Sequence, residues 1–264
     1  MGLRAVMIGL LLAGALLASA GRAAEREAAL ALAPSGTLRA AINLGNAVLA
    51  QADASGGAPH GVSVDLAREL GRRLGVPVEL VTYAEAGEVA ADAGRGAWDV
   101  AFLAIDPARA ETIAFTGPYV VIEGVYVVPE GSKLEGVEAV DGAGVRVCVA
   151  TGSAYDLYLS RALRQAQLVR SGNGREAEAT FLQGGCEALA GVKQALSGLV
   201  RERPGLRMLP GRFMAIRQAM AVPKDREAGL PFLRGFVAEV VASGFVRAAL
   251  DASGQKDAEV AAGE

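Results

Sequence analysis

The sequence has little of the chemistry on which most enzymes and nucleic-acid-binding proteins depend. It holds one histidine, one tryptophan and two cysteines among 264 residues. The lone His60 lies in a loop rich in glycine and proline, and no Cys/His pair or metal-spaced cluster accompanies it. The net charge of −3, without a basic block, excludes the electrostatic footprint of a nucleic-acid-binding protein. We therefore expect no catalytic residue, no metal ion, no cofactor and no nucleic-acid partner.

Long uncharged apolar runs are also scarce, and the clearest stands at the N-terminus. Arg4 precedes the run 5–17, and the small residues 18–20 follow it. This run is shorter than the roughly 20 residues that span a bilayer. The pattern predicts a secretory signal peptide over residues 1–20, cleaved after Ala20 or, as a second choice, after Ala24; a membrane anchor is the alternative. Because charges interrupt every later apolar run, we expect a soluble periplasmic protein without stable membrane insertion.

The two cysteines, Cys148 and Cys186, both lie in short apolar runs in the same half of the chain. An oxidising compartment outside the cytoplasm permits a disulfide between them. Two buried thiols that act as small hydrophobic groups are the alternative. The sequence leaves both possibilities open.

What the sequence does contain is a regular alternation of strand-like and helix-like segments. The predicted strands are 37–45, 76–83, 98–105, 119–128, 145–150, 186–191 and 213–223. The predicted helices are 21–33, 66–74, 85–95, a segment from 154, 192–202 and 226–250. Residues 46–60 are predicted to form a loop. This alternation is typical of an α/β fold with mainly parallel sheets flanked by helices.

Two predicted strands, 119–128 and 213–223, are unusually long and bracket a segment of about 90 residues with its own alternation. They predict two lobes joined by two crossing strands, with a cleft between the lobes. We expect residues 34–123 and 220–250 to form the first lobe, 124–219 the second, and 251–264 a loose tail. An inter-lobe cleft is a common place for a small-molecule site.

A candidate anion site lies in the stretch AIDPARAE. Asp106 suits the N-cap of a helix and Pro107 its first position, so Arg109 is expected in the first helical turn. A cation there opposes the helix dipole unless an anion lies between them. The planar guanidinium of arginine suits a carboxylate in a two-point contact. A solvated arginine, or one paired with Glu111, is the alternative.

A second candidate anion site follows the strand 145–150. Thr151, Gly152 and Ser153 form a short turn that leads into a helix, and Ser153 with Asp156 is a variant of the capping box. Free N–H groups at such a helix start bind anions, although many α/β turns have this sequence. Tyr155 lies beside the turn. One site in each lobe would face the other across the cleft.

Four segments carry a resemblance to a known family: GVSVDLARELGRRLGVPVEL (61–80), WDVAFLAIDPARAETIAFTGPYV (98–120), VRVCVATGSAYDLYL (145–159) and AMAVPK (219–224). The chain resembles the periplasmic solute-binding proteins of ABC importers, in the polar amino-acid (extracellular family 3) group. The resemblance implies a two-lobed, type 2 periplasmic-binding-protein fold, a monomer that closes on a small carboxylate-bearing ligand, and delivery to an ABC permease complex. It also implies that Arg109 and Gly152-Ser153 hold the ligand's carboxylate.

The chain differs from the family at the positions where relatives contact the parts of a bound amino acid other than its carboxylate. Relatives carry Ser or Thr before the arginine, an aromatic after the first strand, and an acid for the ammonium group. Before the arginine, this chain has Phe102, Ala104 and Asp106 in place of Ser or Thr. After the first strand it has Asn43 and Asn46 in place of an aromatic residue. At the position of the acid it has Val192, followed by Lys193 and Gln194. The carboxylate contacts are therefore present and the usual ammonium contact is missing. We expect a small carboxylate without a free α-amino group, or one whose amine is met by Glu123 or Asp106.

The candidate ligand-binding residues are Arg109, Thr151, Gly152, Ser153, Asn46, Ala104, Asp106, Glu123, Tyr155 and Gln194. Two other functions remain open at this point. One is a ligand sensor for a membrane receptor, and the other is a dehydratase-like enzyme on the same fold, with Glu123 and Lys193 as acid and base.

Overall fold

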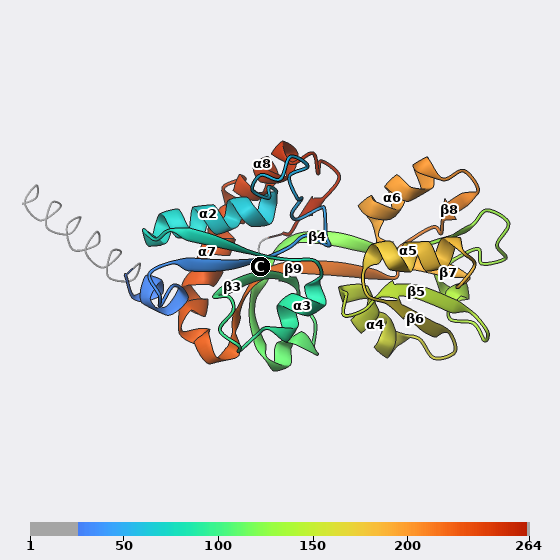
Figure 1. The fold of residues 1–264 in the computed structure, drawn as a ribbon, viewed down its shortest axis with the longest axis horizontal. Helices are drawn as coiled ribbons and strands as arrows, with labels where there is room; N and C mark the ends of the chain where they lie inside the picture. The colour runs from blue at the N-terminus through green and yellow to red at the C-terminus, as the bar shows by residue number, and fades with distance from the viewer. Residues whose placement is uncertain (1–25, 263–264) are drawn as a thin grey trace, which may run out of the picture.

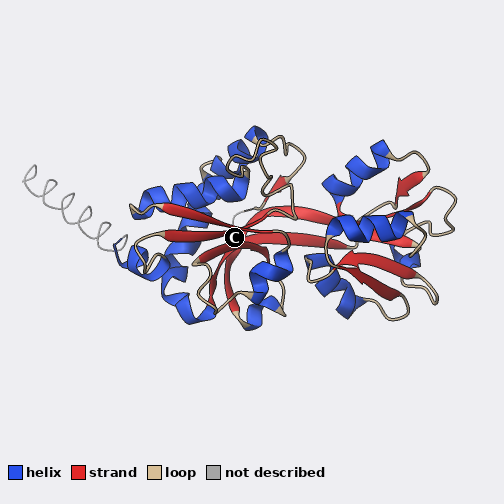
Figure 2. Cartoon of the chain, in the orientation of Figure 1, coloured by secondary structure: helices blue, strands red, loops and turns tan. Residues whose placement is uncertain are grey.

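A computed structural model describes residues 26–262 of the chain. The predicted signal peptide, residues 1–20, and both predicted cleavage positions lie outside the described residues. The chain forms two lobes that lie side by side and are joined by two long strands (Figure 1). Helices cover both faces of the sheet in each lobe (Figure 2).

The first lobe contains the following elements, together with residues 26–32, which are helical. They are β1 (Leu38–Asn43), α2 (Val62–Leu74), β2 (Val78–Tyr83), α3 (Ala86–Ala91), β3 (Val100–Ala104), the 3-10 turn η1 (Arg109–Glu111), η3 (Lys224–Gly229), α7 (Leu230–Ala242), α8 (Phe245–Ala252) and β10 (Glu259–Val260).

The second lobe contains the elements between the two crossing strands. They are η2 (Val137–Val140), β5 (Arg146–Ala150), α4 (Ala154–Ala162), β6 (Gln167–Ser171), α5 (Gly174–Leu182), β7 (Ala188–Val192), α6 (Lys193–Glu202) and β8 (Leu206–Met208). The crossing strands are β4 (Ile113–Pro129) and β9 (Met214–Pro223).

The strands hydrogen-bond in the order β2-β1-β3-β9-β4-β7-β5-β6, so one continuous sheet runs through both lobes. β1 is parallel to β2 and β3, and β5 is parallel to β6 and β7. The crossing strands β4 and β9 are antiparallel to each other, β9 to β3, and β4 to β7. The predicted α/β fold with two crossing strands is confirmed, and the sheet is mixed because the crossing strands run against the parallel strands.

Separate hydrophobic cores fill the two lobes. On β4, Ile122 packs in the core of the first lobe, whereas Val125 packs in a core of the second. This change of core supports our proposal that the first lobe ends near Glu123. On β9, Ile216 already packs in the core of the first lobe, so we propose that the return crossing lies before Ile216 rather than at residue 220.

The elements β6, α5 and β8 were not predicted, and the helix predicted over 226–250 is divided into η3, α7 and α8. Two further differences lie at Asp106 and in the tail. The predicted helix at Asp106 is a 3-10 turn, Arg109–Glu111, because the chain enters β4 at Ile113 directly afterwards. The tail after Asp251 is not loose over its described part. Glu259 and Val260 pair with β4, and Ala258 and Ala261 are buried, since this short strand covers an otherwise open edge of the crossing strand.

Cys148 and Cys186 form a disulfide, with their Cα atoms 5.9 Å apart. Both cysteines are buried in a hydrophobic core of the second lobe. The disulfide therefore links β5 to the residues that lead into β7, and the alternative of two free thiols is wrong.

No single helix among residues 26–262 is long and apolar enough to cross a membrane. The segments Lys224–Ala242 and Phe245–Ala252 meet the length and composition criteria together, but they are bent by 69°. Their apolar residues, such as Leu233 and Val246, are buried in the core of the first lobe.

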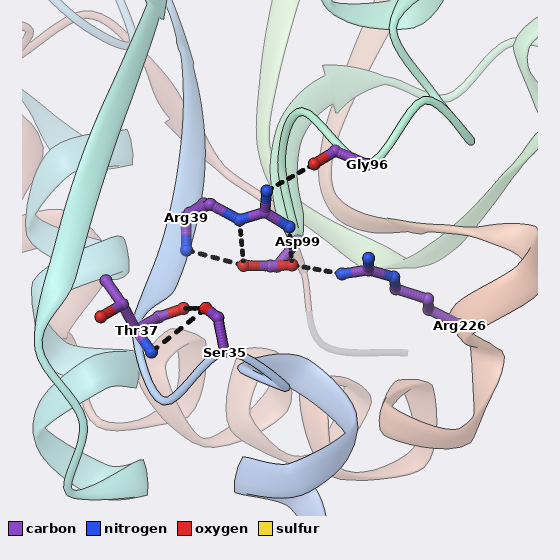
Figure 3. A network of polar contacts seen from close by, with 6 residues as sticks. All are labelled: Ser35, Thr37, Arg39, Gly96, Asp99 and Arg226. Carbon is purple, nitrogen blue, oxygen red and sulfur yellow. Dashed lines mark hydrogen bonds and ion pairs between the residues drawn. The ribbon is translucent and has the colours of Figure 1, made fainter.

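Asp99 is the centre of a buried ion-pair network in the first lobe (Figure 3). Its side chain is fully buried and accepts hydrogen bonds from Nε and Nη2 of Arg39, at 3.0 and 2.7 Å, and from the backbone N–H of Arg39. Arg226 donates to the same carboxylate. Asp99 precedes β3 and Arg39 lies near the start of β1, so the network ties these strands to η3 at their amino ends.

Candidate ligand-binding site

A cleft of about 1360 Å³ lies between the lobes. On the first lobe it is lined by residues at the carboxyl ends of β1 and β3, Asn43 and Ala104 among them. On the second lobe it is lined by Ala154, Gly174 and Lys193, the first residues of α4, α5 and α6. The cleft therefore lies at the carboxyl ends of β1 and β3, and the Asp99 network lies at their amino ends.

Arg109 is the central cation of this cleft and is only 4 % exposed. Its Nη1 donates to the carbonyl of Ala104 at 3.1 Å, and its Nη2 donates to the carbonyl of Gly152 in the second lobe at 2.9 Å. Its buried Nε has no hydrogen-bond partner within the described chain. Burial lowers the pKa of Arg109 to about 10, and the nearby Asp106 carboxylate partly offsets that effect. A buried guanidinium with an unused N–H donor is poorly stabilised unless an anion joins it.

Asp106 positions the arginine from behind the cleft. Its Oδ1 accepts the backbone N–H of Ala108 at 2.9 Å, which fixes the turn that carries Arg109. Its Oδ2 pairs with Arg161 of α4 at 2.6 Å, across the two lobes. Asp106 is not among the residues that line the cleft. The expectation that Asp106 is the N-cap is wrong, because the N-cap of the 3-10 turn is Ala108 and that turn has no side-chain cap.

The turn 151–153 uses most of its own donors. Asp156 accepts the N–H of Gly152 at 2.8 Å, Ser153 N–H bonds to the carbonyl of Ala150 at 3.2 Å, and Ser153 Oγ caps α4 by accepting Asp156 N–H. Thr151 donates its hydroxyl to the Ser171 carbonyl at 2.8 Å. Neither Thr151 nor Gly152 lines the cleft, whereas Ser153 does. The expectation of free N–H groups at Gly152 and Ser153 is therefore wrong for this arrangement of the lobes.

Gly152 has a geometric role beside its carbonyl. Its backbone is in the left-handed region, with φ of +70°, and an added Cβ would lie 3.0 Å from the Cα of Gly87 in the first lobe. Glycine at this position thus allows the two lobes to approach closely. Tyr155, on the first turn of α4, lines the cleft, and burial raises the pKa of its hydroxyl to about 12.

Of the other predicted site residues, Asn46, Ala104, Glu123 and Gln194 all line the cleft. Glu123 is already paired with Lys193 and, at 3.2 Å, with Arg212, and the hydrogen bond from Lys193 is the main reason that the pKa of Glu123 is lowered. Asn46 Oδ1 accepts the N–H of Val48 at 3.2 Å. The buried Oε1 of Gln194 has no hydrogen-bond partner among residues 26–262.

Val192 is the N-cap of α6 and provides no side-chain cap. It lines the cleft beside Lys193. No carboxylate therefore stands at the position where relatives are expected to hold an ammonium group.

Several polar residues of the cleft were not expected from the sequence, Glu85 and Gln218 among them. Glu85 follows β2, and its Oε1 accepts the N–H of Gly174 in the second lobe at 3.3 Å. Burial raises the pKa of Glu85, and no cation contributes to that shift. An acid directly after a predicted parallel strand was the signal. Gln218 is the uncharged polar residue inside the apolar strand β9, and it is only 4 % exposed.

No group of three or more His, Cys, Asp or Glu side chains among the described residues could hold a metal ion. The cleft instead combines one buried guanidinium, hydroxyl and amide groups, apolar walls and carboxylates that include Glu85 and Glu123. The buried guanidinium suits the acidic group of a small organic ligand.

The model of the bacterial extracellular solute-binding proteins, family 3, matches residues 38–252. The chain belongs to this family. The match covers both lobes and both crossing strands, and it confirms the resemblance derived from the four sequence segments. None of the curated proteins matches the chain by sequence.

Solved structures share the fold at low sequence identity. A P235GK mutant of ArgBP from T. maritima has a TM-score of 0.72 and 23% identity, covering 85% of this chain and 98% of its own. AbpA from Streptococcus pneumoniae, an amino acid ABC transporter substrate-binding protein bound to L-arginine, has a TM-score of 0.73 and 20% identity, covering 87% and 99%. An ancestral amino-acid-binding protein, AncCDT-1, described as a precursor of cyclohexadienyl dehydratase, has a TM-score of 0.69 and 20% identity, covering 83% and 95%.

Proposed function

We propose that this family 3 protein captures a small carboxylate-bearing solute, an amino acid or a related organic acid, in the inter-lobe cleft and delivers it to an ABC importer. The observation that carries the proposal is Arg109, a buried guanidinium in the cleft whose Nε has no partner among the described residues. A carboxylate provides two oxygens in the plane of the guanidinium and neutralises its charge. The N-terminal signal in the sequence supports action in the periplasm, and we propose that the protein acts as a monomer with the permease complex as its partner.

The ion pairs of Glu123 and Asp106 indicate whether the ligand carries an amino group in addition to its carboxylate. The two acids that the sequence analysis offered for an amine, Glu123 and Asp106, are each held by basic residues of the chain. Releasing either acid for a ligand would leave a cation without its partner. This arrangement supports a carboxylate without a free α-amino group.

A second candidate ligand is an amino acid whose cationic group is met by Glu85. Glu85 lines the cleft, and burial raises the pKa of its carboxyl group without a cationic neighbour to offset that effect. A ligand cation would stabilise the ionised form of Glu85. The fold is shared with AbpA, whose structure is bound to L-arginine, and with ArgBP.

An enzyme on this fold is the weaker alternative, although the chain shares its fold with AncCDT-1. Glu123 and Lys193, the acid and base that the sequence offered, form an ion pair with each other. An importer and a sensor are distinguished by the neighbouring genes: an adjacent permease and ATPase support import, and an adjacent sensor kinase supports sensing.

The proposal is tested by native mass spectrometry of protein purified without unfolding, followed by thermal-shift measurements with a library of amino acids and organic acids. We expect a small carboxylate to be retained or to raise the melting temperature. If no carboxylate in the library binds, the proposed function is wrong. Loss of the preference for an amino acid over its deaminated analogue in Glu85→Gln would identify the second candidate.

A further inference from the structure

Gln218 is a polar residue in the wall of the cleft, and its side chain forms no hydrogen bond within the described chain. It lies on β9, and its residue is 96 % buried, since 4 % of its surface is exposed. Within residues 26–262 its side-chain amide has no hydrogen-bond partner, although the residue lines the cleft. The amide is not among the fully buried groups that lack a partner, so it is accessible from the cleft to water or to a ligand.

The position of Gln218 relative to Arg109 follows from the strand register. Gln218 pairs with Ala104 of β3, and the carbonyl of Ala104 accepts the hydrogen bond from Arg109 Nη1 at 3.1 Å. Neighbouring strands lie about 4.8 Å apart. Gln218 therefore lies one strand away from the carbonyl that Arg109 contacts, in the wall of the same cleft.

The surroundings of Gln218 are otherwise apolar. On β4 it pairs with Val120, and the neighbours on its own side of the strands, Phe102, Ile122 and Ile216, pack in the hydrophobic core of the first lobe. A neutral amide in an apolar wall forms hydrogen bonds with an uncharged oxygen without the cost of neutralising a charge. Side-chain carboxylates are absent from this group of neighbours.

We propose that Gln218 is a specificity-determining residue that binds an uncharged oxygen, a hydroxyl or a carbonyl, next to the carboxylate of the ligand. The ligand class is then a 2- or 3-hydroxy acid or an oxo acid. This inference rests on the proposed carboxylate site at Arg109 and narrows its ligand.

The test uses four acids of one skeleton: butyrate, 2-hydroxybutyrate, 2-oxobutyrate and 2-aminobutyrate, each measured by calorimetry. We expect the hydroxy or oxo acid to bind about 5- to 20-fold more tightly than butyrate, and Gln218→Leu to reduce the ratio of the two affinities to about one. The 3-substituted butyrates are measured in the same way, so that either position is covered. If Gln218→Leu leaves every preference intact, the inference is overturned. It is also overturned if 2-aminobutyrate binds best and only Glu85→Gln removes its advantage.

A second measurement separates a ligand contact from a structural role. Because Gln218 has no hydrogen bond to lose, Gln218→Leu should raise the melting temperature of the ligand-free protein by about 2–4 °C. The matched control is Thr116→Val on β4. Thr116 is also buried, but its Oγ1 donates to the carbonyl of Met220 and accepts its N–H, both at 3.1 Å, so this variant should lower the melting temperature. A lower melting temperature for Gln218→Leu would show a structural role and overturn the inference.

The proposed function and this inference fail differently. If none of the acids binds and Arg109→Ala has no effect on any ligand, the carboxylate site itself is wrong. If the acids bind in an Arg109-dependent way but Gln218→Leu does not alter their order, the role of Gln218 alone is wrong.

Discussion

The guanidinium of Arg109 in the first lobe donates to the carbonyl of Gly152 in the second lobe at 2.9 Å. Two further contacts join the lobes at the same side of the cleft: Asp106 with Arg161, and Glu85 with the N–H of Gly174. The lobes thus touch at the arginine that is proposed to bind the ligand. We therefore propose that ligand binding at Arg109 is coupled to the approach of the lobes through this side chain.

Arg109→Ala should weaken binding of a carboxylate ligand by about 10- to 150-fold, because a charge-assisted hydrogen bond contributes about 1.5–3 kcal/mol. Calorimetry with the ligand found by native mass spectrometry measures this effect. Arg201→Ala is the matched control, since Arg201 also lines the cleft but is exposed, and it should alter affinity little. Undiminished affinity in a folded Arg109→Ala protein would refute the assignment.

The Asp106–Arg161 pair should stabilise the arrangement in which the lobes touch. The Arg161 side chain is 45% exposed, so the pair contributes about 0.5–1 kcal/mol, and Arg161→Gln should lower ligand affinity about two- to fivefold. Asp106→Asn keeps an oxygen for Ala108 N–H and should have a similar effect. A double-mutant cycle checks the coupling, with the exposed Arg164→Gln as control; additive effects of the two substitutions would contradict a direct pair.

Ligand binding should close the lobes about the crossing strands, with the hinge near 123–125 on β4 and near the paired residues 214–215 on β9. Small-angle scattering should show a smaller radius of gyration for the ligand-bound protein than for the free protein. Arg161→Gln should enlarge the radius of the free protein and leave the bound value unchanged. An unchanged radius of the native protein at ligand saturation would argue against this motion.

Reduction of the Cys148–Cys186 disulfide should destabilise the second lobe. The disulfide spans 38 residues, and a loop of that length corresponds to about 4 kcal/mol in the chain-entropy model. Denaturant unfolding with and without a reductant measures the difference. The double variant Cys148→Ala/Cys186→Ala should be equally destabilised and insensitive to the reductant; a reductant effect that persists in this variant would contradict the explanation.

Asp99→Asn should lower the free energy of unfolding by about 3–5 kcal/mol, because it leaves Arg39 and Arg226 without their shared carboxylate. Urea unfolding measures this loss. Arg95→Gln, which removes an exposed pair with Asp92, should change stability by less than about 1 kcal/mol. Ligand affinity should not change in folded Asp99→Asn, since the network lies at the other end of the strands from the cleft.

The sequence by itself determined most of the alternation of strands and helices, the two long crossing strands and the location of Arg109 after a buried strand, but not β6, α5, β8 or β10. These features depend on local periodicity, glycine and proline positions and short motifs, which act over a few residues. The family resemblance also rested on contiguous segments. The pairing of Cys148 with Cys186 was one of two open possibilities, because it depends on residues that are distant along the chain.

Only the tertiary structure decided which polar groups are free and which are used. Glu123 and Asp106 were available acids in the sequence, but Lys193, Arg212 and Arg161 reach them from segments far along the chain. Residues 258–261 were expected to be loose because β4, the strand with which β10 pairs, lies more than a hundred residues earlier in the chain. Gln218 appeared as one polar residue in an apolar strand; its place beside Ala104, which holds Arg109, follows only from an antiparallel register that no local pattern specifies.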